Sequence, residues 1–384
     1  MYIYNARIDP VTSPVIANGY IRIENGVIAE LSEGTPPHIS PDDIDADKHT
    51  VMPGLIDSHS HIGFIGDGGS VEAEDVNEAS DPVTPQLRAI DGLNFMDNCF
   101  ADAVKCGVTS AVTGVGSTNP IGGSLIAIKT AGRCADEMLI RPAAIKFALG
   151  ENPKGCYSDR DETPMTRMAT AALIREALFT ARRYESDLRA AAEDDADMPD
   201  FDMKSEALIP LLRREVKAHF HCHRADDIMT AVRISEEFGL DLVLVHCTEG
   251  HLISDLLAEK HLCANIGPII CDRGKPELAH ATLKNAALLH ESGVMISICT
   301  DHPEVPVDYL PASAAFCVKA GLPRDEAVRA ITINAARITG IDDLTGSLEV
   351  GKDADIIMPS GDILDIMSEN LLTMINGRIV YRNR

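Results

Sequence analysis

The segment that decides the fold reads Pro53-Gly54-Leu55-Ile56-Asp57-Ser58-His59-Ser60-His61-Ile62-Gly63. Its apolar half predicts a buried β-strand, and because side chains alternate across a strand, the two histidines leave on the same face. Two neutral ring nitrogens on one face can bind one cation. An isolated His-x-His pair is more often an ordinary pair of core or surface histidines, so the metal-site interpretation depends on what the rest of the chain adds.

Seven further apolar runs follow this segment, and helical patterns separate most of them. This alternation predicts βα units and a parallel sheet, and eight strands close a (β/α)8 TIM barrel, an α/β fold. The expected strands cover residues 55–61, 108–115, 124–129, 143–149, 216–223, 241–246, 263–269 and 294–301. The expected helices cover residues 85–106, 165–193, 225–238, 251–259, 277–291 and 324–339.

Both ends of the chain carry short strands joined by tight turns. Asn25-Gly26 and Asn376-Gly377 are typical two-residue hairpin turns. Neither end has enough strands or apolar surface to be stable alone. We therefore expect residues 1–52 and 345–384 to form one small composite β-sandwich beside a hydrolase barrel built from residues 53–344.

The composition narrows the class of partner. The chain has 34 Lys and Arg against 59 Asp and Glu, a formal charge of -25, which repels phosphate backbones and anionic headgroups. We expect a small-molecule substrate, no nucleic acid and no membrane. The ten cysteines form no Cys-x-x-Cys pair, and the N-terminus has no basic and apolar leader. A cytoplasmic protein with reduced thiols is therefore expected.

Ionisable residues cluster at the ends of the predicted strands. In α/β barrels the carboxyl ends of the strands carry the catalytic groups, because the βα loops there form the pocket. This shared position, rather than any single motif, makes metal binding the stronger interpretation. The residues concerned are His59, His61, Lys146, His219, His221, His223, His246 and Asp301.

Lys146 lies in an apolar strand, where burial penalises the ammonium form and lowers the pKa. A neutral amine can take up carbon dioxide to become a carbamate, whose two oxygens can bridge two cations. Two alternatives stay open: Lys146 projects into solvent, or it pairs with Glu151. Glu151 is also the alternative bridging ligand.

The fifth strand places three histidines on one face, and they span too much of the strand for all of them to bind metal. We expect His221 to be the ligand, with His246 on the next strand completing a two-nitrogen site. His223 and Arg224 are expected at the rim, where they would receive an anionic or carbonyl group of the substrate. His219 is expected to pack lower in the barrel.

Asp301 follows an apolar run and would be a costly buried charge without a cation. Across the barrel from His59 and His61, it could bind metal and also accept a proton from a water molecule that the cation activates. We therefore expect Asp301 to be both ligand and catalytic residue. A helix N-cap role is the alternative.

These motifs, together with Thr300-Asp301 and the closing segment Gly346-Ser-Leu-Glu-Val-Gly-Lys-Asp-Ala-Asp355, resemble the metal-dependent amidohydrolase superfamily and, within it, the imidazolonepropionase-like branch. The resemblance implies a (β/α)8 barrel with a composite β-sandwich, one or two divalent metals that are usually zinc, and hydrolysis at a carbon centre. It matches His59, His61, His221, His246 and Asp301 to the family's ligands. Lys146 stands where binuclear members such as hydantoinases and isoaspartyl dipeptidases keep a carboxylated lysine.

The expected activity is hydrolysis of an amide or cyclic amide C–N bond by a metal-activated hydroxide. Glu151 to Lys154 and the His-Cys-His-Arg224 run are similar to a subgroup of uncharacterised amidohydrolases, so the substrate stays open. The rivals are a mononuclear deaminase or a dipeptidase of the same superfamily, and a non-catalytic scaffold. A homo-oligomer is expected only because closed symmetric assemblies are common.

Overall fold

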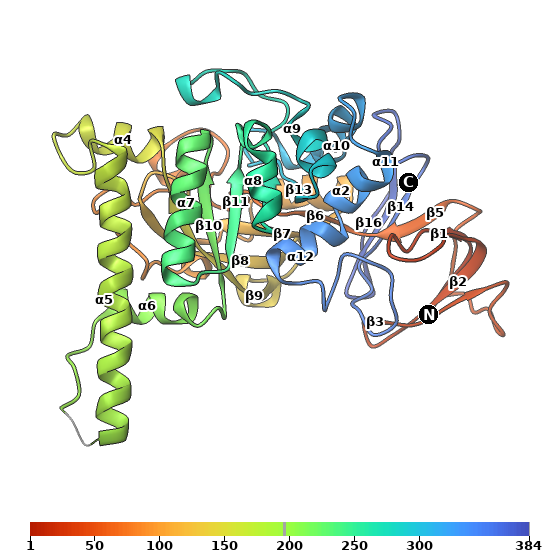
Figure 1. Ribbon diagram of the computed structural model, residues 1–384. Coiled ribbons are helices and arrows are strands. Elements are labelled where there is room, and N and C mark those ends of the chain that lie inside the picture. The colour runs from red at the N-terminus through yellow and green to blue at the C-terminus, as the bar shows by residue number, and fades with distance from the viewer. Residues whose placement is uncertain (195–196, 384) are drawn as a thin grey trace.

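The computed structural model describes residues 1–194 and 197–383. In this part of the chain two eight-stranded sheets dominate the architecture (Figure 1). One sheet is a nearly closed barrel covered by helices, and the other combines strands from both ends of the chain. The α/β barrel with an added terminal β unit, expected from the sequence, is therefore confirmed.

The barrel sheet has the order β13-β12-β11-β10-β9-β8-β7-β6. The two outermost strands approach each other through side-chain and loop contacts: the Thr300 N–H donates to Asp57 Oδ1 (3.1 Å), and the Asp301 N–H donates to the His59 carbonyl (3.1 Å). The strands are β6 (Leu55–Asp57), β7 (Val108–Gly114), β8 (Ile121–Lys129), β9 (Leu139–Ala148), β10 (Lys217–Cys222), β11 (Leu242–His246), β12 (Cys263–Ile266) and β13 (Met295–Ile298).

One strand contradicts the expectation of an all-parallel sheet. β8 runs antiparallel to both β7 and β9, whereas the remaining neighbours in the barrel pair in parallel. The reason is the connection: β7 ends at Gly114 and β8 begins at Ile121, which leaves too few residues for a parallel crossover. Because β8 reverses direction, β9 again runs parallel to β7 and carries Lys146 at the same end as the other site residues.

Helices cover the outside of the barrel. The expected helices 85–106 and 324–339 are each divided in two, whereas the expected helix 165–193 is one long helix, α5. The helices are α1 (Ala89–Gly92), α2 (Cys99–Cys106), α3 (Ala135–Met138), α4 (Glu151–Ser158), α5 (Arg167–Asp194), α6 (Met203–Leu212), α7 (Ala225–Phe238), α8 (Ser254–Glu259), α9 (Asn285–Glu291), α10 (Leu310–Lys319), α11 (Arg324–Ala330) and α12 (Ile333–Thr339). Short 3-10 helices are η1 (Val71–Ala73), η2 (Gly250–Leu252), η3 (Pro276–Leu278) and η4 (Val307–Tyr309).

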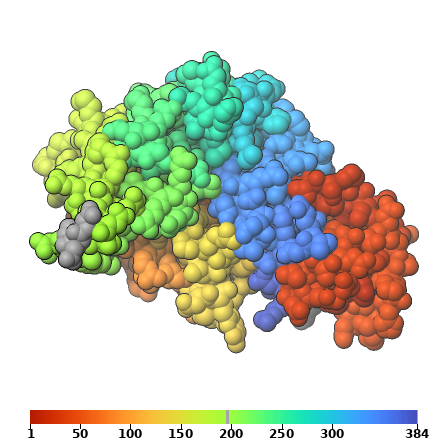
Figure 2. All heavy atoms as spheres, turned by 60° about the horizontal axis from the view of Figure 1, so that its bottom comes forward, coloured from red at the N-terminus to blue at the C-terminus, as the bar shows by residue number. Residues whose placement is uncertain are grey.

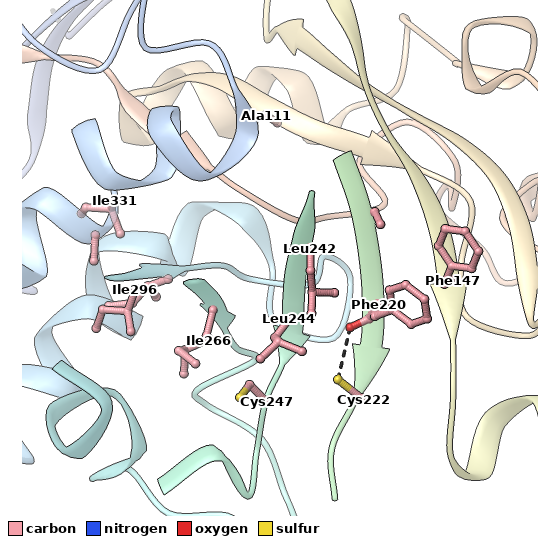
Figure 3. Close-up of a cluster of buried hydrophobic side chains, with 14 of the residues drawn as sticks. Ala111, Phe147, Phe220, Cys222, Leu242, Leu244, Cys247, Ile266, Ile296 and Ile331 are labelled. Atoms are coloured by element: carbon pink, nitrogen blue, oxygen red, sulfur yellow. Dashed lines mark hydrogen bonds between the residues drawn. The ribbon is translucent and has the colours of Figure 1, made fainter. Parts of the chain in front are cut away.

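Alternation along the strands separates the apolar core from the site. Phe147 on β9 and Phe220 on β10 stack with ring centroids 4.5 Å apart, and Leu244 and Ile266 continue the same buried cluster on the next strands (Figure 3). Their sequence neighbours, including Lys146, point to the opposite face of the sheet. Packing of the aromatic face therefore fixes where the polar side chains lie.

The terminal sheet has the order β16-β15-β14-β5-β1-β2-β3, with β4 paired to β1. Its halves join where β5 pairs antiparallel with β14, and apolar side chains from both ends fill one buried cluster. Figure 2 shows the N-terminal segment in red against C-terminal residues in blue. The strands are β1 (Tyr2–Ile8), β2 (Ile16–Glu24), β3 (Val27–Glu33), β4 (Ile44–Asp45), β5 (Thr50–Pro53), β14 (Ile356–Pro359), β15 (Asn370–Ile375) and β16 (Arg378–Arg382). Every helix in the described ranges is too short or too polar to span a bilayer.

Candidate metal centre

Side chains from three places in the chain meet at the carboxyl end of the barrel. His59 and His61 follow β6, Lys146 lies near the end of β9, and Asp301 follows β13. Asp301 Oδ1 is 3.5 Å from His59 Nε2 and 3.4 Å from His61 Nε2, and Lys146 Nζ is 2.8 Å from His59 Nε2. His59, His61, Lys146 and Asp301 therefore lie close together, as the sequence predicted.

Backbone carbonyls orient two of the histidines. His61 Nδ1 lies 2.8 Å from the Gly114 carbonyl oxygen, and His246 Nδ1 lies 2.6 Å from that of Gly267. A carbonyl only accepts a hydrogen bond, so Nδ1 carries the proton in both rings and Nε2 keeps a free lone pair. This is the arrangement that metal-binding histidines use.

The ligand atoms form two groups that share His246. His59, His246 and Asp301 make one group, and His221, His223 and His246 make the other; in each, the ligand atoms lie within 4.8 Å of one another. Nitrogen and carboxylate ligands at this spacing suit a divalent transition metal such as zinc. The residues present therefore fit the metal that their pattern implies.

The neutral histidines and the ionised Asp301 have the protonation states that metal binding requires, whereas Lys146 is still largely an ammonium at pH 7. Desolvation lowers the pKa of His59 well below its ordinary value and that of His246 to about 4, so both rings are neutral at pH 7. Desolvation also lowers the pKa of Lys146 to about 8. For Asp301 burial alone would raise the pKa, but His246 and His61 outweigh it and lower the pKa to about 2.

Two of the site residues hold a strained backbone. His246 has φ 69° and Asp301 has φ 56°, in the left-handed region that costs a residue with a side chain about 1–3 kcal/mol. Such conformations persist where the surrounding structure imposes them. Here they turn the chain at the ends of two strands so that each side chain reaches the centre of the barrel mouth.

The three histidines of β10 and its extension have different surroundings. His221 and His223 belong to the second ligand group, whereas His219 lies beside Lys146 in the sheet and outside both groups. His223 stacks on His246 with a centroid distance of 4.7 Å, and its Nδ1 is 2.7 Å from Thr248 Oγ1. The sequence predicted that His223 lies at the rim and contacts the substrate. Its ring instead lies among the side chains that could bind the metal.

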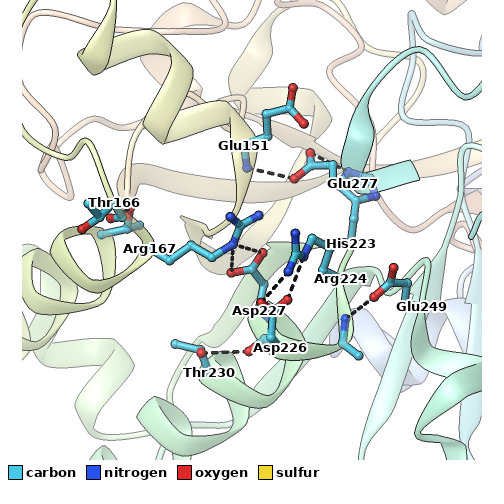
Figure 4. A network of polar contacts seen from close by, with 12 residues as sticks. Glu151, Thr166, Arg167, His223, Arg224, Asp226, Asp227, Thr230, Glu249 and Glu277 are labelled. Atoms are coloured by element: carbon cyan, nitrogen blue, oxygen red, sulfur yellow. Dashed lines mark hydrogen bonds and ion pairs between the residues drawn. The ribbon is translucent and has the colours of Figure 1, made fainter. Parts of the chain in front are cut away.

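Arg224 and Glu151 do not line the cavity. Figure 4 shows Arg224 beside Asp226 and Glu151 beside Glu277. The Arg224 guanidinium pairs with Asp226 at 2.9 Å, because α7 begins at the next residue and brings that carboxylate close. Glu151 is the first residue of α4, and its backbone N–H donates to Glu277 Oε2 at 2.8 Å. This geometry therefore does not favour a substrate contact for Arg224 or Glu151. It also does not favour Glu151 as a bridging ligand.

A cavity of about 1140 Å³ opens above the ligand groups. Its wall includes residues that the sequence did not single out: Asn152 on α4 and the charged residues Arg273 and Lys275 on the connection between β12 and α9. Buried Glu277 lies behind this wall, with Oε1 3.8 Å from His223 Nε2. The sequence predicts a strand up to residue 269 and a helix from residue 277 here, but the backbone between Ile266 and Asn285 is irregular apart from η3, so both expected bounds are wrong. The path of this connection over the barrel mouth depends on tertiary contacts.

Comparison with known proteins agrees with this geometry. The model of the amidohydrolase family matches residues 50–380. Amidohydrolase tasK of Hapsidospora irregularis is 30% identical over 94% of this chain, which spans only 39% of the length of that protein, and imidazolonepropionase of Treponema denticola is 24% identical over 95% of this chain and 94% of its own. The crystal structure of an amidohydrolase from Thermotoga maritima MSB8 superposes over the whole of both chains with a TM-score of 0.95 and 37% identity. This chain belongs to the amidohydrolase family.

Proposed function

We propose that this protein is a metal-dependent hydrolase that cleaves a C–N bond of a small molecule, an amide or a cyclic amide. The observation that carries the proposal is the meeting of His59, His61, Asp301 and His246 at one end of the barrel. Relatives named as amidohydrolases and imidazolonepropionases support the reaction class.

In the proposed centre, His59, His61 and Asp301 would hold one cation, since both histidines lie next to Asp301, and His221 and His246 would hold a second, with zinc expected from the ligand types. Lys146, whose Nζ lies 2.8 Å from His59 Nε2, would supply a further anionic ligand if it were carboxylated to a carbamate. When bound, the cations lower the pKa of water and polarise the substrate carbonyl.

The chain's own residues then move the proton. Asp301 is a carboxylate at neutral pH, so it can accept the proton of the attacking water through an oxygen. As the tetrahedral carbon collapses and the C–N bond breaks, Asp301 returns that proton to the leaving nitrogen. The Gly114 and Gly267 carbonyls keep the His61 and His246 rings in place throughout.

A mononuclear deaminase is the second candidate. It is favoured by one comparison: a 5-methylthioadenosine/S-adenosylhomocysteine deaminase of Teredinibacter turnerae is 30% identical over 34% of this chain. One equivalent of metal per chain in the fully active protein would favour this candidate, whereas two equivalents favour the binuclear hydrolase.

Metal removal and an Asp301 variant test the proposal. Dialysis against a chelator should abolish hydrolysis of a panel of N-acyl amino acids, cyclic amides and dipeptides, and added zinc should restore it. Asp301→Asn should keep most of the metal and lose about 10²–10⁴-fold in kcat, the range for a lost proton-transfer group. Metal content and initial rates provide the measurement.

Asp255→Asn, at an exposed carboxylate on α8, is the matched control and should leave kcat unchanged. Turnover that survives complete metal removal would refute the proposed chemistry. Turnover retained by Asp301→Asn would remove Asp301 from the proton-transfer step alone.

A further inference from the structure

The connection between β12 and α9 forms one wall of the cavity. It leaves the barrel after Ile266, carries the short helix η3 and returns at Asn285. Figure 1 shows it as a long excursion beyond the ends of the strands. Arg273 and Lys275 lie on this connection and line the cavity, and the Arg273 guanidinium donates to the Ala281 carbonyl at 2.8 Å across the loop.

A buried carboxylate anchors this wall to α4. Glu277 is 1% exposed, and its Oε2 accepts the Glu151 backbone N–H at 2.8 Å (Figure 4). The approach is close because residue 150 is glycine: a Cβ there would lie 2.6 Å from Glu277 Oε2. The connection is therefore held in place at the point where it carries Lys275.

Lys275 is connected through Asn152 to His221, a proposed metal ligand. Its Nζ donates to Asn152 Oδ1 at 2.7 Å, and Asn152 Nδ2 lies 3.5 Å from His221 Nε2. Asn152 thus stands between the ammonium group and the metal centre. These contacts put the ammonium group beside the candidate centre, where a carboxylate close to the scissile C–N bond could pair with it.

The cavity wall carries basic side chains beside the carboxylates of Asp272, Asp301 and Glu304, in a chain that is strongly acidic overall. Arg273, Lys275, Lys284 and Lys319 line it, and within the described ranges none of the four has a carboxylate partner within 4.0 Å. By contrast, Arg224 outside the cavity is already paired with Asp226. An unpaired ammonium held by a neutral amide can accept a carboxylate ligand without first breaking an ion pair.

We propose that Lys275, with Asn152, forms the site that binds a free carboxylate on the amine side of the scissile bond, so that the substrates are N-acyl amino acids or dipeptides. The proposal rests on the proposed hydrolase function and names its substrate class. It also assigns the carboxylate to Lys275 in place of Arg224; neither Arg224 nor Lys154, which serves as the control below, lines the cavity.

Binding of substrate mimics tests this assignment without requiring turnover. The probes are N-methylphosphonyl derivatives of alanine, proline, leucine, aspartate and lysine, each as the free carboxylate and as the carboxamide. Calorimetric titration of the metal-loaded protein should show at least one side chain whose carboxylate form binds about tenfold more tightly than its carboxamide, a difference of about 1.4 kcal/mol.

Lys275→Met should reduce this preference to less than about threefold by weakening the carboxylate form alone, and Lys275→Arg should retain part of it. Lys154→Met on α4 is the matched control and should keep the full preference. Because Lys275 is exposed, both substitutions should preserve the metal content and the circular dichroism spectrum.

Three results would overturn the site: equal affinity for both forms, a preference that survives Lys275→Met, or no binding of any carboxylate. If any of these accompanied metal-dependent hydrolysis of uncharged amides, the proposed function would stand and the carboxylate site would be wrong. If the preference depended on Lys275 but no C–N bond were cleaved, the site would stand and the proposed function would be wrong.

Discussion

At the scale of single residues, the first-strand histidines and Asp301 could be predicted because their sequence positions carry the signal. Each lies at the end of an apolar run, where a buried polar group needs a partner. Lys275 and Glu277 could not be predicted, because they lie on an irregular connection whose path is set by tertiary contacts. The strained φ angles of His246 and Asp301 could not be predicted from the sequence either.

Lys146 gives a prediction at this scale. Burial lowers its pKa to about 8, which makes the neutral amine accessible near neutral pH, and Nζ lies within 2.8 Å of a proposed ligand atom. We expect protein loaded with metal in ¹³C-bicarbonate to show a carbamate carbon resonance. Lys146→Ala should lack the resonance and bind about one metal fewer per chain.

Lys154→Ala is the control for this experiment, since it removes an amine outside the cavity and should change neither the resonance nor the metal content. A wild-type protein that binds two metals without any carbamate signal would rule out the bridging role of Lys146. The direct contact of its amine with His59 would then be the functional arrangement.

At the scale of elements, the length of a connection explains why the expectation of an all-parallel sheet is wrong. Apolar runs identify the eight barrel strands, but they do not specify the direction in which β8 runs. The short connection from Gly114 to Ile121 permits a hairpin and excludes a parallel crossover. Strand identity is encoded locally, whereas strand direction depends on the length of the connection.

The contact between α4 and the β12–α9 connection gives a prediction at the element scale. Gly150 has φ 83°, and a Cβ at this position would lie 2.6 Å from Glu277 Oε2. Gly150→Ala should therefore displace Glu277 and cost about 1–3 kcal/mol of stability. Limited proteolysis should cut the connection faster, and urea unfolding should report the lower stability.

Gly155→Ala, within the same helix, is the matched control. A Cβ at Gly155 meets nothing within 4 Å, and alanine is favoured over glycine in a helix by about 0.5–1 kcal/mol. This variant should be at least as stable as the wild type and no more sensitive to protease. Equal behaviour of the two variants would mean that Glu277 does not hold the connection.

At the scale of the whole molecule, the barrel and the terminal sheet are joined by a buried ion pair. Lys129 Nζ on β8 lies 2.7 Å from Asp353 Oδ2 and 2.5 Å from Asp355 Oδ2. Lys129 is 4% exposed and Asp355 is 1% exposed. Asp355 also accepts hydrogen bonds from Thr345 and from the Asn376 backbone N–H, so the pair ties the barrel to several parts of the C-terminal segment.

Removing one partner of a buried ion pair leaves the other charge uncompensated, which typically costs about 3–5 kcal/mol. We expect Lys129→Met to lower the free energy of unfolding by that amount, measured by urea denaturation. The comparison is Arg141→Met, which breaks the exposed Arg141–Asp343 pair between β9 and the turn after α12 and should cost less than about 1 kcal/mol. Adding Asp355→Asn to Lys129→Met should recover part of the loss, because the unpaired charge is removed while the amide oxygen can still accept from Asn376. If Lys129→Met costs no more than Arg141→Met, the terminal sheet is attached to the barrel by apolar packing rather than by this ion pair.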